Sequence, residues 1–464
     1  MPSPTILPRM KGYERATPAT ILTKVVQLIE DGHNIILHGP GGVGKSFTIC
    51  HLIKYYRVVL GLTPASTPVT ALTGVAALVL SQQGTKARTL HSWAGIGIGE
   101  GTADTLANKI MADPRKKRAW EAAWLLVIDE ISMLSMELYN KLDAIARLVR
   151  KKNVPFGGIQ LILSGDFLQL PPVEKNKKEP NFIFESERWL STKFVWLELE
   201  VPKRYTDLTW FHRLLRFRSG THTDDDWEFL RTRNQAWLDL LEQNNEKLIV
   251  RPTVLKATRA DVSAENMREL DILPGDPILF TSRYSRIIKR GGRDNLPYYI
   301  QLFQKDIHQE VSLKVGAQVM LRVNVDVDLG LVNGSRGVVI SVAEGGAEVL
   351  WSNGRQTSVV PYDWVMEDDD GIYTCSQIPL ILAWSITIHR VQASTLDCVV
   401  LDLSKIFAGG QGYVGLSRVR SAGDLYVSGL VDPSKVKMDS KAHKFLEELE
   451  KVEVIGEITE MVVS

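Results

Sequence analysis

Short apolar runs alternate with helical patterns in the first part of the chain. Ile35-Ile36-Leu37 predicts a buried strand, and the segment from Phe47 to Tyr55 carries apolar residues at helical spacing. The same alternation predicts helices over about 20–32 and over Leu72–Leu78, with strands at Pro68–Ala71, Trp124–Glu130 and Ile159–Leu163. Strands and helices that alternate in this way are typical of a parallel α/β sheet.

The pattern changes twice further along. After a predicted strand at Phe194–Leu199 and another at Thr253–Lys256, residues from about 275 to 376 show short alternating strands separated by Gly and Asn turns. Evenly spaced short strands of this kind predict a small β-barrel. After this region the sequence again shows an α/β pattern, with a strand expected at Cys398–Leu401 and a terminal helix expected over Lys441–Val452.

Composition limits the class of protein. A chain of 464 residues is expected to form several domains, and a hydrophobic content of 44% suffices for more than one core. With 23% charged residues and a formal net charge of only +1, a nucleic-acid partner would have to meet a local basic channel. The three cysteines are far apart and form no C-x-x-C pair, which argues for a reducing compartment without a disulfide framework or zinc site.

Targeting signals are not evident in the sequence. No apolar run approaches the length of a membrane span, and the proline-rich first 19 residues lack a signal-peptide core and are expected to form a loose leader. We therefore expect a soluble intracellular protein; the compartment (nucleus, mitochondrion, or bacterial or viral-host cytoplasm) stays open.

One motif carries the clearest chemistry. Residues 39–46 read G-P-G-G-V-G-K-S between the predicted strand and helix, which is the arrangement of a phosphate-binding loop. Its backbone N–H groups and helix N-terminus would bind the phosphates of a nucleoside triphosphate, with Lys45 bridging the β- and γ-phosphates and Ser46 ligating Mg²⁺. The expected nucleotide-binding residues are Gly39, Gly41, Gly42, Val43, Gly44, Lys45, Ser46 and Phe47. The alternative is a glycine turn that only resembles the motif.

Polar residues follow two later strands of the same region. Asp129 and Glu130 end the strand that begins at Trp124, where an open parallel sheet places its chemistry. Asp129 suits a Mg²⁺ ligand and Glu130 suits the base that polarises the attacking water, although an acidic pair can also cap a helix. Gln169 follows the next strand and can sense the γ-phosphate; a polar turn held by Pro171 and Pro172 is the alternative.

Five segments together resemble successive helicase motifs: Gly39–Ser46, Val69–Ala77, Thr89–Gly99, Asp129–Met133 and Gly165–Pro172. The chain is similar from about residue 20 to 430 to the PIF (petite integration frequency) family of DNA helicases, in the RecD-like branch of superfamily one. The glycine-rich T-L-H-S-W-A-G-I-G-I-G loop and G-D-F-L-Q-L-P-P are the most specific matches. The resemblance implies an α/β fold of two RecA-like lobes with a small SH3-like β-barrel inserted in the second, ATP between the lobes and single-stranded DNA across their top.

The expected domain boundaries follow from that resemblance. We expect a leader (1–19), a first lobe (20–190) with a wedge-like accessory segment (about 89–122), a second lobe in two parts (191–274 and 377–440), the β insertion (275–376), and a C-terminal helix and tail (441–464).

The resemblance also implies roles for residues outside the phosphate loop. Arg204 resembles an arginine that reaches the γ-phosphate from the second lobe, and Arg418 resembles the arginine finger of the last helicase motif. Expected DNA contacts are Thr70, Thr73, Gly74, His91, Ser92, Trp93, Thr258, Asn333, Thr387, His389 and Gln392. Trp93 would stack on a base. Thr258 could equally be a helix cap.

Three positions depart from the family pattern. Tyr205 stands where Gln usually follows the arginine, and Ala393 stands where Gly usually follows the motif's Gln392, which would be strained if the position needs positive φ. Leu22 occupies the apparent place of the adenine-reading Gln, with Gln27 the nearest alternative. Adenine selectivity is therefore less firmly expected than ATP binding.

The function that the resemblance implies is ATP-dependent unwinding of duplex DNA with 5′-to-3′ movement on single-stranded DNA, by a monomeric motor that acts on tailed duplexes in replication, repair or recombination. A translocase that does not separate strands and a DNA-binding clamp without turnover are the alternatives. Lys45, Glu130, Arg204 and Arg418 argue against the clamp.

Overall fold

The computed structural model describes residues 13–16, 21–97, 99–173, 179–242, 250–326, 329, 331–367, 370–429, 432–433 and 436–450. The chain divides into two compact units. The first unit comprises Met1–His222, Ala408–Tyr413 and Lys437–Ser464, and the second comprises Thr223–Phe407 and Val414–Val436. Within the described residues, no helix combines the length and the apolar character needed to cross a membrane.

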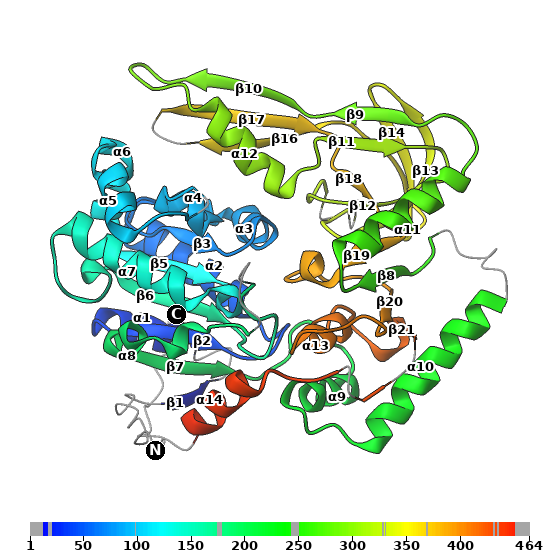
Figure 1. The fold of residues 1–464 in the computed structure, drawn as a ribbon, viewed down its shortest axis with the longest axis horizontal. Helices are drawn as coiled ribbons and strands as arrows, with labels where there is room; N and C mark the ends of the chain where they lie inside the picture. Colours follow the sequence, from blue (N-terminus) through cyan, green and yellow to red (C-terminus); the bar gives the residue numbers. More distant parts are fainter. Residues whose placement is uncertain are drawn as a thin grey trace. The chain divides into compact units, whose positions relative to one another are not determined.

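A seven-stranded sheet forms the centre of the first unit, with every neighbouring pair parallel (Figure 1). Its strand order is β1-β7-β2-β6-β5-β3-β4. The strands are β1 (Tyr13–Ala16), β2 (Asn34–His38), β3 (Val69–Ala71), β4 (Arg88–Thr89), β5 (Leu125–Asp129), β6 (Gln160–Gly165) and β7 (Phe194–Leu199). Because β2, β5 and β6 are internal and covered on both faces, they read as the continuous apolar runs seen in the sequence.

Helices pack around this sheet and complete its core. They are α1 (Ile21–Glu30), α2 (Lys45–Lys54), α3 (Gly74–Leu80), α4 (Leu90–Ala94), α5 (Ala103–Met111), α6 (Pro114–Ala122), α7 (Met136–Arg150), α8 (Glu187–Thr192), α9 (Leu208–Ser219) and α14 (Ser440–Glu450). The C-terminal α14 is part of the core, since Phe445 stacks on Phe184 with ring centroids 4.0 Å apart. Short π- or 3₁₀-helical turns occur at Tyr55–Val59, Ser81–Thr85, Ile131–Met133, Pro155–Gly158 and Ile183–Glu185.

Three expectations about the first unit are corrected. β7 pairs with β2 and β1, so this unit extends to His222 rather than ending near residue 190. The leader contributes β1 to the edge of the sheet, while residues 1–12 and 17–19 lie outside the described part. The expected loop over Thr89–Gly99 contains the helix α4, because Thr89 caps it through the Ser92 N–H and Leu90 and Trp93 bury their side chains.

The second unit contains a four-stranded parallel sheet in the order β19-β8-β20-β21. Its strands are β8 (Thr253–Lys256), β19 (Ser385–Thr387), β20 (Val399–Asp402) and β21 (Leu425–Ser428). The helices of this part are α10 (Asp224–Glu242) and α11 (Arg259–Ile272), with 3₁₀ turns at Ile388–Val391 and Ala422–Asp424. The boundary between the units falls within α13 (Gln411–Leu416).

Antiparallel strands fill the region between α11 and β19 (Figure 1). They are β9 (Ile278–Thr281), β10 (Arg283–Ile288), β11 (Glu310–Leu313), β12 (Gln318–Leu321), β13 (Arg336–Ala343), β14 (Gly346–Trp351), β15 (Gln356–Val359), β16 (Tyr362–Glu367), β17 (Gly371–Gln377) and β18 (Leu380–Leu382). They form sheets in the orders β15-β14-β13-β12-β18, β10-β17-β16 and β11-β9. The β-rich insertion was predicted, but α12 (Leu296–Asp306) within it was not; its Tyr299 stacks on Tyr373 of β17 at 3.9 Å. The SH3-like character of the insertion stays a prediction.

Candidate nucleotide-binding site

The phosphate loop joins β2 to α2 as the sequence predicted. Gly44 takes the left-handed conformation (φ 97°) at the N-terminus of α2, so the chain can turn directly into the helix. Gly39 (φ 141°) lies so close to β7 that a Cβ there would come within 2.3 Å of the Leu199 carbonyl oxygen. Both positions therefore require glycine, and the loop's backbone N–H groups are placed at a helix N-terminus, where phosphate binds.

Lys45 is held by the loop itself. Its Nζ donates to the carbonyl oxygens of Gly39 (2.7 Å) and Pro40 (2.8 Å). Burial lowers the pKa of this ammonium, and the nearby carboxylates of Asp166, Glu130 and Asp129 oppose that effect. A bound triphosphate would offer Lys45 anionic oxygens in place of two neutral carbonyls.

The oxygen atoms expected to hold Mg²⁺ are already together. Ser46 Oγ donates to Asp129 Oδ2 at 3.0 Å, although the two residues are 83 positions apart in the chain. β5 places Asp129 at its carboxyl end, where the carboxylate is buried. A hydroxyl and a carboxylate beside a phosphate loop fit a magnesium ion that also binds phosphate oxygens and water. The ion supplies charge neutralisation and orients the phosphates when bound.

Glu130, the expected base, has an unusual backbone. It adopts the left-handed conformation (φ 60°, ψ 44°) at the start of the turn Ile131–Met133. A non-glycine residue in this region carries a strain of about 1–3 kcal/mol and persists only where its surroundings enforce it. Gly165 of β6 is the enforcing neighbour, since a Cβ there would come within 2.9 Å of the Ile131 N–H nitrogen.

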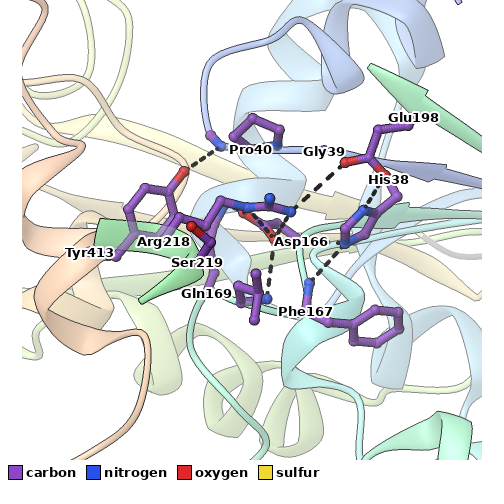
Figure 2. Close-up of polar contacts among 12 residues, drawn as sticks. His38, Gly39, Pro40, Asp166, Phe167, Gln169, Glu198, Arg218, Ser219 and Tyr413 are labelled. Carbon is purple, nitrogen blue, oxygen red and sulfur yellow. Dashed lines mark hydrogen bonds and ion pairs between the residues drawn. The ribbon is translucent and has the colours of Figure 1, made fainter. Parts of the chain in front are cut away.

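A buried polar network lies beside the loop (Figure 2). We call it the Asp166 cluster; it comprises His38, Asp166, Gln169, Glu198 and Arg218. Asp166 accepts hydrogen bonds from Arg218 Nε and Nη2 at 2.9–3.1 Å, and Gln169 Nε2 donates to Asp166 Oδ2 at 3.3 Å. Of these five residues, the sequence pattern pointed only to Gln169.

The charges of the cluster stabilise one another. Burial by itself would raise the pKa of the Asp166 carboxyl, but the Arg218 guanidinium holds it below its usual range. Burial likewise opposes ionisation of Glu198, yet the His38 ring and Arg218 lower its pKa to about 2. His38 Nε2 faces the Phe167 N–H at 3.3 Å, which assigns the ring proton to Nδ1, the atom 2.8 Å from Glu198 Oε2.

Arg204 belongs to the first unit, which corrects its expected place in the second lobe. The N–H groups of Lys203 and Arg204 both donate to the Gly42 carbonyl (2.8 and 3.0 Å), so this segment packs on the phosphate loop. Tyr205 fills the place of the usual Gln with a buried ring that stacks on Phe211 and approaches Gly42. The role of the Arg204 guanidinium at the γ-phosphate stays a prediction.

Tyr413 is a second residue that sequence reasoning missed. Its hydroxyl accepts a hydrogen bond from the Gly41 N–H at 3.0 Å, although it lies 372 positions further along the chain (Figure 2). Burial raises the pKa of the Tyr413 hydroxyl, which therefore stays neutral. The sequence signal near it is the stretch G-Q-G-Y-V-G-L-S-R at residues 410–418, which contains Tyr413 and ends at Arg418, the residue compared with the last helicase motif.

Two expected DNA contacts in the first unit are buried, and their contact with DNA stays a prediction. Trp93 is 3% exposed and packs against Trp120 in the core, with ring centroids 4.7 Å apart, so its face is covered by protein rather than open to a base. Thr70 is fully buried in β3 and donates its hydroxyl to the Val127 carbonyl. Both residues support the fold of the motifs that contain them.

The remaining expected DNA contacts of the first unit are partly exposed: Thr73, Gly74, His91 and Ser92. Thr73 caps α3 by accepting from the Ala76 N–H. In the second unit Thr258 caps α11 and Thr387 caps the turn Ile388–Val391. The cap alternative considered for Thr258 is therefore correct at the level of local structure, and DNA contact stays a prediction for it and for Asn333, Thr387, His389 and Gln392.

The turn after Thr387 contains one of the three sequence departures, Ala393. Ala393 has φ 66°, so the position where glycine is usual does require the left-handed conformation. Arg418 clamps this turn: its Nη1 donates to the carbonyl oxygens of Val391 and Ser394, both at 3.1 Å, and its Nε donates to the Val414 carbonyl. The guanidinium is 1% exposed, so a finger role requires it to exchange these acceptors for phosphate oxygens.

The comparisons with known proteins agree with this site. Residues 15–212 match the family model of PIF1-like helicases, and residues 305–342 match that of the 2B domain of the DNA helicase Pif1. An ATP-dependent DNA helicase PIF1 from Xenopus laevis is 36% identical over 457 residues, which cover 97% of this chain and 67% of that protein. The chain belongs to the PIF1-like helicase family.

Solved structures of the family have the same fold. A Pif1 helicase from Candida albicans is 33% identical, with a TM-score of 0.72 over 92% of this chain and 98% of that one. Pif1 from Bacteroides sp in complex with ADP-AlF4 is 27% identical, with a TM-score of 0.73 over 93% of this chain and 97% of that one. Bacteroides Pif1 bound to single-stranded DNA is 26% identical, with a TM-score of 0.61 over 93% of this chain and 96% of that one. The two RecA-like lobes expected of the PIF family are thereby confirmed. The chain spans about two thirds of the length of the curated relatives that it matches.

Proposed function

We propose that this PIF1-like chain is a DNA helicase that hydrolyses ATP with Mg²⁺, moves 5′-to-3′ along single-stranded DNA as a monomer and unwinds tailed duplexes during replication, repair or recombination. The observation that carries the proposal is the assembled hydrolytic site. Two separate segments meet in it, at the carboxyl ends of β2 and β5. The first carries Lys45 and Ser46, and the second carries Asp129, which accepts a hydrogen bond from Ser46, and the strained Glu130.

This arrangement supports turnover rather than binding alone. The phosphate loop orients the triphosphate, Ser46 and Asp129 would hold Mg²⁺, Glu130 would polarise water, and Gln169 would contact the γ-phosphate. A clamp without turnover would need none of the strain at Glu130. Single-stranded and forked DNA are the proposed substrates because relatives have been solved with single-stranded DNA and at forked duplex DNA, the latter with two coordinating Pif1 helicases.

The test is strand displacement on a duplex with one single-stranded tail, with ATP and Mg²⁺. Helicase activity with the proposed polarity predicts displacement of a 5′-tailed duplex and little of a 3′-tailed one. Glu130→Gln should bind ATP and lose displacement by about 10²–10⁴-fold. Glu137→Gln is the matched control, since Glu137 lies on α7 and pairs only at the surface with Lys141.

The outcomes separate the alternatives. DNA-stimulated ATP hydrolysis without displacement would identify a translocase that does not unwind. Binding of DNA without hydrolysis would identify a clamp. Near-normal turnover in Glu130→Gln would remove Glu130 from the role of base. Sedimentation of the protein bound to a tailed duplex tests whether the motor acts as a monomer. Two copies per DNA at saturating protein would contradict the monomer.

A further inference from the structure

Gln169, the expected γ-phosphate contact, hydrogen-bonds to Asp166 through both its side chain and its backbone. Its side-chain Nε2 donates to Asp166 Oδ2 (3.3 Å), and its backbone N–H donates to the Asp166 carbonyl oxygen (2.9 Å). The Leu168 N–H donates to Asp166 Oδ1 at 3.1 Å. Because one carboxylate binds both the amide of Gln169 and the backbone just before it, any rotation of that carboxylate moves the sensor.

Arg218 fixes the plane of this carboxylate. Nε donates to both Asp166 oxygens (3.1 and 3.0 Å) and Nη2 donates to Oδ1 (2.9 Å), which is a two-sided contact that an ammonium cannot reproduce. Asp166 has no exposed surface, so water does not compete for these bonds. Figure 2 shows Arg218 on one side of Asp166 and His38 on the other.

The backbone of the sensor is also held. A Cβ at Gly410 would come within 2.3 Å of the Gln169 carbonyl oxygen and 2.6 Å of the Leu168 carbonyl oxygen, so this segment packs against the turn without a gap. Because the backbone is packed in this way, we consider rotation of the Gln169 side chain as its remaining freedom. The hydrogen bond to Asp166 is the contact that limits it.

We propose that Arg218 is a positioning residue for γ-phosphate recognition, which acts by holding Asp166 so that Asp166 aims Gln169. The inference rests on the proposed ATPase function. Arg218 lies in the last turn of α9, which ends at Ser219, and the chain enters the second unit at Thr223. The same contact therefore links the orientation of the sensor to the segment that leads out of the first unit.

A purely structural ion pair is the alternative, and buried pairs are poor evidence of function by themselves. The two explanations differ in which ligand they affect. A structural role predicts equal effects on ADP and on a triphosphate, whereas a positioning role predicts a selective loss for the ligand with a γ-phosphate.

The experiment compares binding of ADP and of the non-hydrolysable analogue AMP-PNP, with Mg²⁺ and without DNA. In the parent, the ratio of the two affinities measures γ-phosphate recognition, and Gln169→Ala should lower it. Arg218→Lys should lower it by about tenfold with ADP affinity unchanged, the size of effect expected when a charged group loses one well-placed hydrogen bond. Combining Arg218→Lys with Gln169→Ala should add nothing to Gln169→Ala alone.

Two further variants keep the test decisive. Asp166→Asn with Arg218→Met removes both charges of this ion pair together, leaves Glu198 its contact with His38, and should lower the ratio as Arg218→Lys does. Arg147→Met is the matched control, because it removes an arginine bonded at 2.8 Å to another buried carboxylate, Asp143, on α7. It should lower thermal stability and leave the ratio unchanged.

A parent-like ratio in folded Arg218→Lys overturns the proposal, as does an effect that adds to that of Gln169→Ala. A parent-like ratio in Gln169→Ala overturns it too, since Gln169 would then be no sensor. Because binding is measured without DNA, each of these results is distinguishable from a failure of strand displacement in the parent protein.

Discussion

Ala393→Gly should stabilise the second unit, in contrast to most alanine-to-glycine substitutions. Ala393 has φ 66°, a conformation that costs an L-residue about 1–2 kcal/mol and glycine almost nothing. The Arg418 hydrogen bonds to the Val391 and Ser394 carbonyls hold the turn in this conformation. The wild-type chain therefore carries a strain that the substitution removes.

Two smaller effects oppose this gain. Glycine increases the conformational entropy of the unfolded chain by about 0.4–1 kcal/mol. Loss of a half-buried methyl group removes roughly half of the 0.8 kcal/mol expected for a fully buried one. The net expectation is a stabilisation of about 0.5 kcal/mol.

The assay is urea denaturation at equilibrium, with Ala383→Gly as the matched control. Ala383 is fully buried in the same unit and is not among the residues with positive φ, so glycine there should destabilise the protein by about 1.5 kcal/mol. The same alanine-to-glycine change should therefore alter the free energy of unfolding in opposite directions at the two positions, with a difference of about 2 kcal/mol. If Ala393→Gly destabilises the protein as much as Ala383→Gly, the strain argument is refuted.

Three other predictions concern turnover, base selectivity and pH. If Arg418 is the arginine finger, Arg418→Ala should lower the rate of DNA-stimulated ATP hydrolysis about 10³-fold, and it should also lower stability because three backbone carbonyls lose a hydrogen-bond donor. Hydrolysis that survives in the folded variant would contradict the arginine-finger role. Leu22→Gln should raise the preference for ATP over GTP in kcat/KM by about fivefold, the worth of one neutral hydrogen bond, and an unchanged ratio would show that position 22 does not face the base. The pKa of Glu198 is lowered from 4.5 to about 2, so the stability that its carboxylate contributes is complete above pH 4.5 and is lost as the pH falls toward 2. Glu198→Gln should therefore reduce the dependence of the free energy of unfolding on pH in that range, and an unchanged dependence would show that another group causes the acid sensitivity.

Local sequence determined the elements that carry nucleotide chemistry. The apolar runs that became β2, β5 and β6 are buried on both sides, and such strands leave an unambiguous pattern. The glycines of the phosphate loop and the carboxylates that end β5 are adjacent in the chain to those strands, so their places followed directly. For Ala393 the sequence raised only the condition that positive φ would cause strain, because glycine is usual there; the structure shows φ 66°.

Tertiary structure decided the features that depend on distant partners. β7 joined the first sheet because it pairs with β2, and no pattern within Phe194–Leu199 specifies that neighbour. Trp93 entered the core because Trp120 covers its ring, whereas an aromatic residue in a glycine-rich segment looks equally suited to bind a base. The Asp166 cluster joins residues from β2, the turn after β6, β7 and α9, and its charges are stable when buried only because they meet. Pairing of this kind is set by the fold as a whole, which is why the sequence showed Gln169 and not the arginine that holds it.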